Sequence, residues 1–113
     1  MTRHDDNTRL RHMLDHAEEA VAMASGKRRD DLDNNRLLEL ALTRLAEVVG
    51  EAAARVSRGE QGHHPQIPWP EIAGLRNRLV HGYDAVDLDI LWEIVQVDFP
   101  HLISVLRRDL DTV

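Results

Sequence analysis

The chain has 113 residues, enough for one domain with a single core but few enough that a partner subunit could complete that core. It contains no cysteine, which excludes a disulfide framework, a thiolate metal site and a cysteine nucleophile. The formal net charge of -6 argues against nucleic-acid binding unless basic side chains gather locally, because contacts with phosphate groups need cations.

The polar start of the chain, its lack of a long apolar run and its lack of cysteine indicate the cellular compartment. Residues 1–6 are polar, and no apolar run approaches the length of a membrane span. The absence of cysteine fits a reducing compartment. We therefore expect a cytoplasmic protein with no standard export signal and no membrane contact.

The first predicted helix has one amphipathic stripe. Its apolar residues recur at steps of four and three, at Leu10, Leu14, Ala17, Val21 and Ala24. Asp5 or Asp6 can cap its start, and Ser25-Gly26 marks its end because glycine permits the chain to reverse. The basic triplet at 27–29 has acidic residues beside it, so we interpret it as a solvated loop and not as an RNA contact.

The second predicted helix covers about residues 33–58. Its apolar face repeats at Leu38, Leu42, Leu45, Val49, Ala52 and Val56 and is widened by Leu37, Ala41, Val48 and Ala53. A face that wide indicates contact with more than one neighbour. The small residues of segment 50–54 would let another helix approach closely.

Segment 57–65 breaks the helical pattern with two glycines and a proline. Its adjacent pair, His63 and His64, does not predict a metal site, because adjacent side chains diverge and no cysteine or carboxylate stands at a recognised ligand spacing. An extended, proline-rich approach to the next helix follows, where Trp69 is expected to fill the core.

The third predicted helix spans about residues 70–81. Its buried residues are expected to be Ile72, Leu75 and Leu79. Pro70 suits the first turn, because the N–H that it lacks would be unpaired there. Gly82 is a natural stop at the C-terminal end.

A fourth helix, capped by Asp87 or Asp89, is expected to run to about Leu110 and to bend at Pro100. No strand pattern, internal repeat or low-complexity tract interrupts the sequence. The sequence therefore predicts one all-α domain over residues 1–113, an up-and-down bundle of four main helices with short loops.

Polar chemistry concentrates between Gly74 and Asp84. At roughly 100° per residue, Asn77 and His81 share one helical face, and Arg76 lies about a quarter turn from Asn77. Arg76 and His81 would converge if the helix ended at His81 and its ring turned back, which Gly82 allows. A histidine near neutrality can transfer protons, and the planar fork of arginine matches phosphate oxygens.

A purely structural interpretation uses the same residues. Asn77 and His81 would then cap the last helical turn. Arg76 and Arg78 would be solvated, and Tyr83 would pack its ring. Spacing alone favours this interpretation, because an arginine and a histidine five residues apart occur by chance in many helices.

Residues 67–83 and 86–92 closely resemble the HepT-like branch of the HEPN superfamily, and so do residues 49–53 of the second helix. HepT proteins are the toxins of MntA/HepT type VII toxin–antitoxin pairs. The likeness covers most of the chain from about Leu37 onward.

The signature of that family is an arginine followed, after four to six residues, by a histidine. Arg76 and His81 satisfy it, and the residue after the arginine is polar, as it usually is in the family, here Asn77. Tyr83 completes the Arg-x4-His-x-Tyr form typical of HepT. Gly82 departs from many relatives, in which a bulkier or acidic residue is common.

The resemblance implies a homodimer whose two motifs face each other across a cleft and cleave RNA without a metal or another cofactor. The ribose 2'-hydroxyl would attack the adjacent phosphorus, with His81 as general base or acid and Arg76 stabilising the phosphorane. Asn77 would orient one of these two side chains. Arg76 and Arg78 from both chains would make the cleft locally basic, with Arg78 contacting RNA phosphate, which partly answers the objection raised by the net charge.

The same resemblance implies a protein partner. An MntA-like nucleotidyltransferase antitoxin would transfer AMP to Tyr83, placing negative charge and bulk two residues from His81. The alternative is a non-catalytic helical interaction module that binds a nucleotidyltransferase or a nucleotide, in which the motif only positions that partner.

Overall fold

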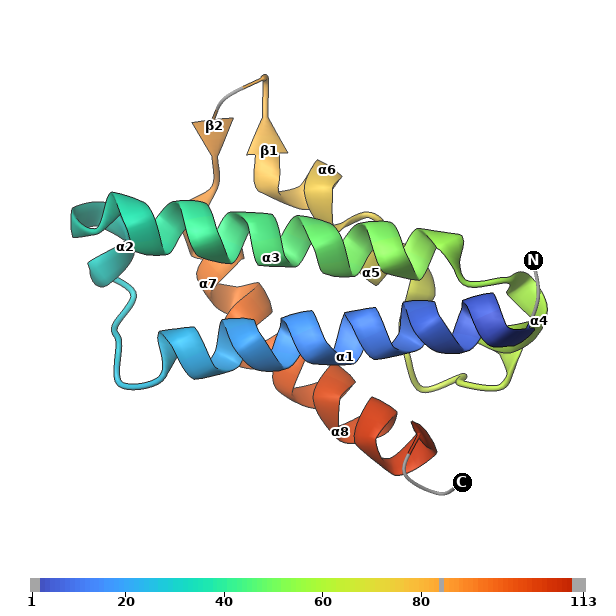
Figure 1. The fold of residues 1–113 in the computed structure, drawn as a ribbon. Coiled ribbons are helices and arrows are strands. Elements are labelled where there is room, and N and C mark those ends of the chain that lie inside the picture. Colours follow the sequence, from blue (N-terminus) through green and yellow to red (C-terminus); the bar gives the residue numbers. More distant parts are fainter. Residues whose placement is uncertain (1–2, 84, 111–113) are drawn as a thin grey trace.

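Two long antiparallel helices form the frame of the structure (Figure 1). The computed structural model describes residues 3–83 and 85–110. In it, α1 (Arg3–Ala24) lies alongside α3 (Arg36–Arg55), and α8 (Phe99–Leu110) crosses and contacts α1. The apolar faces of these three helices enclose most of the core.

The predicted first helix is confirmed by α1, but the predicted cap is wrong, because Asp5 and Asp6 lie within the first turn of the helix. It ends at Ala24, beside the predicted stop at Ser25-Gly26. Leu10, Leu14 and Ala17 of the predicted stripe are buried. Sequence periodicity alone was therefore sufficient to orient this helix.

α3 matches most of the predicted second helix. It begins after Asn35, whose side-chain oxygen accepts a hydrogen bond from the Leu38 N–H at 3.0 Å. The predicted start at about residue 33 falls inside a separate one-turn helix, α2 (Asp31–Asn34). As its wide apolar face predicts, α3 contacts α1 and several later elements.

The predicted third helix is divided into two short ones. They are α5 (Trp69–Ala73) and α6 (Leu75–Leu79), separated by Gly74. α5 packs closely on α3 at Gly50, where a Cβ atom would lie only 3.1 Å from the carbonyl oxygen of Ile72. The close approach expected at the small segment of α3 is thus confirmed.

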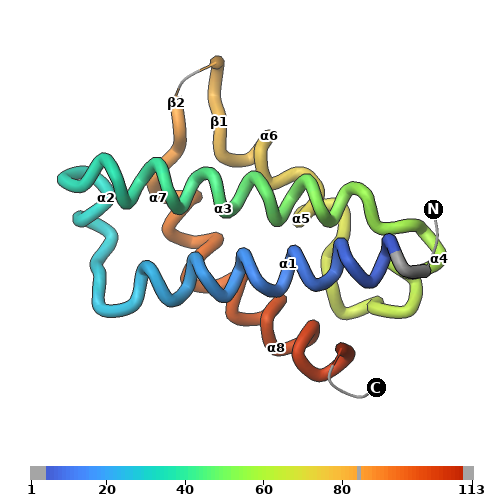
Figure 2. Tube along the Cα trace, in the orientation of Figure 1, coloured from blue at the N-terminus to red at the C-terminus, as the bar shows by residue number. Residues whose placement is uncertain are grey.

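A β-hairpin follows α6, so the predicted helix end at His81 and the predicted absence of strands were wrong. β1 (Val80–His81) pairs antiparallel with β2 (Ala85–Val86), with Val80 opposite Val86. Gly82 turns the hairpin at φ 76°, in the left-handed region that favours glycine. Strands of two residues are too short to show alternation in the sequence. Figure 2 shows the hairpin projecting from the bundle beyond α3.

The predicted fourth helix is a helical segment with a wide turn inside it. Its parts are α7 (Leu88–Glu93), the π-helix η1 (Ile94–Asp98) and α8. Asp87 caps it as predicted, because its Oδ1 accepts a hydrogen bond from the Ile90 N–H at 3.1 Å. The Phe99 N–H donates to the Ile94 carbonyl, five residues earlier. This wider turn accommodates Pro100, whose ring would crowd the carbonyl four residues before it in an ordinary α-helix.

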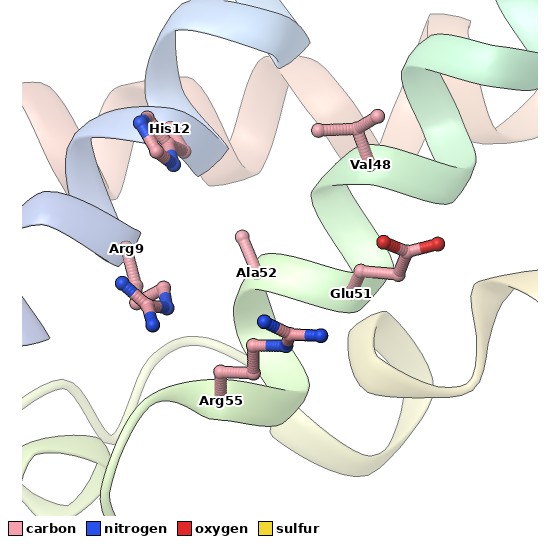
Figure 3. Close-up of a pocket in the computed structure, with 6 residues that line it drawn as sticks. All are labelled: Arg9, His12, Val48, Glu51, Ala52 and Arg55. Atoms are coloured by element: carbon pink, nitrogen blue, oxygen red, sulfur yellow. The ribbon is translucent and has the colours of Figure 1, made fainter. Parts of the chain in front are cut away.

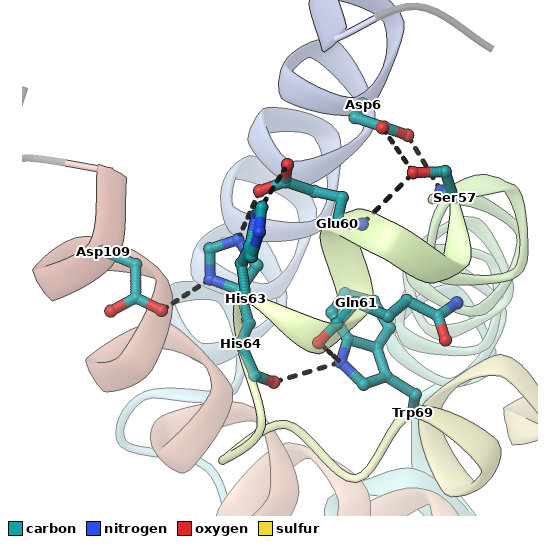
Figure 4. Close-up of polar contacts among 8 residues, drawn as sticks. All are labelled: Asp6, Ser57, Glu60, Gln61, His63, His64, Trp69 and Asp109. Carbon is teal, nitrogen blue, oxygen red and sulfur yellow. Dashed lines mark hydrogen bonds and ion pairs between the residues drawn. The ribbon is translucent and has the colours of Figure 1, made fainter.

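A polar cluster ties α1 to the segment after α3 (Figure 4). Ser57 caps α4 (Arg58–Gly62), and its hydroxyl donates to Asp6 Oδ2 at 2.6 Å. The Ser57 N–H also donates to Asp6 Oδ1, at 2.8 Å. These two hydrogen bonds lower the pKa of Asp6 and hold the start of α1 against this segment.

The same cluster contains a buried histidine. His64 lies between two carboxylates, with Nε2 2.7 Å from Glu60 Oε2 and Nδ1 2.6 Å from Asp109 Oδ2 (Figure 4). Trp69 is buried as predicted, and its indole N–H donates to the carbonyl oxygens of Gln61 and His64, each at 3.1 Å. Both ring nitrogens of His64 therefore serve the fold.

The described part of the chain is mostly helical, which confirms the all-α class. Across residues 3–83 and 85–110 it contains eight α-helices, one π-helix and a two-stranded sheet, where the sequence predicted four main helices. None of the helices in these ranges combines the length and apolar character needed to cross a membrane.

Candidate active site

α6 and the hairpin carry the residues of the candidate site. Leu75 and Leu79 are fully buried and hold α6 against the bundle. Arg76 and Asn77, which lie between them, are exposed. The buried leucines therefore fix a short helix whose polar residues face solvent.

Arg76 extends over the surface toward α3. Its side chain is 73% exposed, and its Nε lies 3.6 Å from Glu47 Oε2. This distance indicates a loose ion pair and not a hydrogen bond. The donors of the guanidinium group consequently stay accessible to an anionic ligand.

His81 stands on β1 beside the carboxylate of Asp87. Its side chain is 62% exposed, and its Nε2 lies 3.6 Å from Asp87 Oδ2. Asp87 is fixed at the base of the hairpin, because its N–H donates to the Leu79 carbonyl at 2.8 Å while its Oδ1 caps α7. At 3.6 Å the contact is not a hydrogen bond, so the fixed carboxylate places its negative charge beside the imidazole ring.

Arg78 and Asn77 differ in how they are held. Arg78 is one-third exposed, and its Nη1 donates to Asp98 Oδ2 on η1 at 2.9 Å. This contact fixes α6 to η1 and offsets the charge of Arg78. Asn77 makes no side-chain hydrogen bond within the described part of the chain and points to solvent.

Tyr83 lies at the turn of the hairpin and is fully exposed. The structural interpretation, in which its ring packs, is therefore wrong. Its predicted helix cap is wrong as well, since α6 is closed by the backbone N–H of Val80 and not by the side chains of Asn77 or His81. Its solvated Arg76 is confirmed, whereas Arg78 is paired with Asp98. Asp84, the last residue of the polar stretch, lies outside the described residues.

The polar groups of the motif residues are held apart from one another in the described part of one chain. Among the residues that the structure describes, no hydrogen bond or ion pair joins Arg76, Asn77 and His81, and the arginine and the histidine face different carboxylates. The site thus presents a permanent cation and an imidazole as separate, solvent-accessible groups on α6 and the hairpin.

The sequence matches the family described as Ribonuclease HepT-like over residues 13–108. The chain belongs to this family. The matched range includes α6 and the hairpin, and with them every candidate site residue of this HepT-like chain.

Named relatives of this HepT-like chain come from archaea and bacteria. A protein of Methanocaldococcus jannaschii named "Putative RNase" is 30% identical over 102 residues, which cover 90% of this chain and 94% of the relative. A "Putative RNase" of Caldanaerobacter subterraneus subsp. tengcongensis is 32% identical, covering 82% of this chain and 83% of the relative. A "Probable ribonuclease HepT" of Thermococcus cleftensis is 36% identical over 65% of this chain and 66% of the relative. No solved structure matches the chain.

Two carboxylates of this HepT-like chain face the motif without having been predicted to do so. Asp87 was expected as a helix cap, but its contact with His81 depends on hairpin pairing that helical periodicity does not reveal. Glu47 reaches Arg76 from α3, and nothing in the sequence distinguishes it from other glutamates on exposed helix faces.

Proposed function

We propose that this HepT-like chain is a metal-independent endoribonuclease and the toxin of a toxin–antitoxin pair. One observation carries the proposal: Arg76 and His81, the two residues of the family signature, are both solvent-accessible on α6 and the adjoining hairpin. The names of the relatives support an activity on RNA.

The proposed reaction is an intramolecular transesterification. The ribose 2'-oxygen attacks the adjacent phosphorus, a base takes its proton, and an acid protonates the departing 5'-oxygen, which leaves a 2',3'-cyclic phosphate and a 5'-hydroxyl. His81 supplies the base or the acid, with the Asp87 carboxylate beside its ring. Arg76 stabilises the charge that gathers on the phosphorane oxygens, while Asn77 positions the imidazole or a phosphate oxygen.

A second copy of the chain would complete the site. In an in-line displacement the 2'-oxygen and the departing 5'-oxygen lie on opposite sides of the phosphorus, so two copies of His81 across a homodimer can divide the two proton transfers. An exposed apolar surface supports such an interface: Leu37 and Leu40 on α3 are 79% and 46% exposed. Leu40 and Glu47 are seven residues apart and so share one face of α3, the face toward which Arg76 extends.

Tyr83 is the proposed point of regulation. Its fully exposed hydroxyl is open to an MntA-like nucleotidyltransferase antitoxin. The tyrosine oxygen would attack the α-phosphorus of ATP and release pyrophosphate, and its proton would pass to solvent. The resulting phosphodiester adds negative charge next to the site, which would repel the RNA backbone.

The decisive experiment is RNA cleavage by the purified protein in chelator. We expect the wild type to produce 2',3'-cyclic phosphate ends, and Arg76→Ala and His81→Ala to lose about 100-fold or more of the rate. Arg11→Ala and His63→Ala serve as matched controls, because both residues are exposed and lie outside the site. If wild type, variants and controls all leave RNA intact, the chain is the non-catalytic interaction module instead.

The toxin role has its own test. Expression of the chain without its partner should arrest growth, and the arrest should disappear in His81→Ala. Growth equal to that of cells expressing His81→Ala would refute the toxin role, even if the purified protein cleaves RNA.

A further inference from the structure

A basic hollow lies between α1 and α3, apart from the candidate active site. It has a volume of about 320 Å³, is open to solvent, and is lined by Arg9, His12, Val48, Glu51, Ala52 and Arg55. Figure 3 shows Arg9 and His12 reaching from α1 and Arg55 from α3 around the short side chain of Ala52. Two guanidinium groups and an imidazole therefore surround one small residue.

The two arginines of the hollow have no carboxylate partner within the described part of the chain. Several other arginines are paired with carboxylates, among them Arg29, Arg36, Arg78 and Arg107. Within the described part of the chain, neither Arg9 nor Arg55 forms an ion pair or a side-chain hydrogen bond.

The nearby carboxylates do not neutralise the hollow. Glu51, on its rim, lies 3.7 Å from Arg44 and is shared with that cation. Asp6, close to Arg9 in sequence, accepts two hydrogen bonds from Ser57, and Arg9 acts on it only as a charge. A net positive charge therefore stays available inside the hollow.

The chemistry of the hollow suits a phosphate group. Guanidinium groups present planar donor forks that match phosphate oxygens, and His12 adds a further ring N–H donor. No Phe, Tyr or Trp is among the described residues that line the hollow, so it offers no stacking platform for a base. Its open form admits a passing strand and does not enclose a small molecule.

The hollow and the candidate active site lie along the same helix. Arg76 contacts α3 at Glu47, Glu51 follows one turn later at the hollow, and Arg55 follows after one more turn. At a rise of 1.5 Å per residue, Glu47 and Arg55 are about 12 Å apart along the axis of α3. An RNA strand held at Arg76 can therefore reach the hollow within a few nucleotides.

We propose that this hollow binds a backbone phosphate of the RNA strand outside the cleavage site. The inference rests on the proposed ribonuclease function and adds a second, sequence-independent contact to it. Such a contact raises affinity for long strands and leaves the chemistry at His81 unchanged.

Binding can be tested without cleavage by placing every variant on a His81→Ala background. The hollow pair is the double variant Arg9→Gln/Arg55→Gln, and the control pair is Arg11→Gln/Arg28→Gln. Their affinities for a labelled single-stranded RNA are compared by fluorescence anisotropy over a range of salt concentrations. Both pairs remove two positive charges, but the control pair lies outside the hollow. We expect the Arg9→Gln/Arg55→Gln variant to lose about tenfold in affinity and about 0.7 units of salt slope, the contribution of one phosphate contact on a single strand, with smaller changes in the control pair.

Several outcomes would overturn the inference. Equal losses in the two pairs would show a general effect of net charge, and absence of RNA binding by the His81→Ala protein would remove the basis of the site.

Arg9→Lys/Arg55→Lys should keep the salt slope. If this variant loses as much affinity as the glutamine pair, the arginines act through packing. AMP and inorganic phosphate, added as competitors, should displace RNA only weakly. Strong displacement by AMP would instead assign the hollow to a mononucleotide.

The test also separates this inference from the proposed function. If the wild type cleaves RNA, the hollow pair in an otherwise wild-type chain should raise KM for a long RNA and leave cleavage of a dinucleotide unchanged. If the wild type does not cleave RNA but the hollow pair still loses RNA binding, the ribonuclease proposal fails and the phosphate site stands.

Discussion

His64 Nδ1 lies 2.6 Å from Asp109 Oδ2, which joins the segment after α4 to the last turn of α8. Glu60 faces the other ring nitrogen, at 2.7 Å. Burial opposes protonation of the ring, but the hydrogen bonds to both carboxylates outweigh it and raise the pKa of His64. Arg108 also contacts Asp109, and His63 lies 3.5 Å from Glu60, so the cluster contains both signs of charge.

We expect this contact to make folding stability depend on pH. A raised pKa means that the folded protein holds the His64 proton more tightly than the unfolded chain does. The stabilisation from protonated His64 is therefore complete below about pH 6.5 and is lost as the pH rises through the pKa of His64 in the folded protein. The lowered pKa of Asp109 affects stability at acidic pH. The stabilisation from the Asp109 carboxylate is present above about pH 4 and is lost on further acidification.

Denaturant unfolding across this pH range measures the effect. His64→Gln should cost about 1–3 kcal/mol at pH 6, by removing the charged hydrogen-bond partner of two partly buried carboxylates, and should flatten the profile above neutrality. His63→Gln is the matched control, because the neighbouring ring is 75% exposed. A wild-type profile that stays flat between pH 6 and pH 9 would contradict the assignment.

Asp87 has two roles that separate substitutions can distinguish. Asp87→Asn keeps a side-chain oxygen that can cap α7 but removes the carboxylate facing His81. We expect little change in stability, together with a fall in kcat smaller than the roughly 100-fold contribution of a general base.

Asp87→Ala, by contrast, removes the cap as well and should cost about 1 kcal/mol of stability. Thermal unfolding and cleavage kinetics of the two variants provide the measurement. An Asp87→Asn enzyme whose kcat equals that of the wild type would show that Asp87 only caps the helix.

Gly82 sets the geometry of the hairpin. A Cβ atom at this position would meet nothing within 4 Å, so Gly82→Ala introduces only the backbone strain of a positive φ, about 1–2 kcal/mol. Because the hairpin projects from the bundle, we expect local opening and slower cleavage, with a small change in the midpoint of global unfolding.

The matched control for Gly82 is Gly59→Ala in α4. It also has free space around its Cβ position but no positive φ, and should be neutral or slightly stabilising. Amide chemical shifts of residues 80–86 report the hairpin directly. Unchanged shifts in Gly82→Ala would show that the turn tolerates alanine.

Sequence periodicity predicted the long elements because their buried faces repeat over many turns. Leu10, Leu14 and Ala17 orient α1, and the small residue Gly50 indicated where another helix approaches. The hairpin was missed because Val80 and His81 extend a pattern that is also compatible with one more helical turn. What decides their conformation is pairing with Val86 and the turn at Gly82, which are contacts between residues and not a local repeat.

The candidate site was predicted in its residues but not in its surroundings. The arginine, histidine and tyrosine were identified by a family signature, whereas Glu47 and Asp98 come from other elements and are brought to the motif only by the fold. The role of His64 was missed for the same reason, since Asp109 lies 45 residues away in the chain.

Tyr83 provides the test of the proposed regulation. Incubation with a nucleotidyltransferase partner and ATP should raise the intact mass by one or more adenylate units, because the phenolic oxygen is fully exposed at the hairpin turn. Tyr83→Phe should keep the wild-type mass and should still cleave RNA, since its ring and the nearby His81 are unchanged. The modified wild type should lose cleavage through charge repulsion of the RNA backbone. A mass increase that persists in Tyr83→Phe would place the modification on another residue, and full cleavage by the adenylated protein would separate the modification from control of activity.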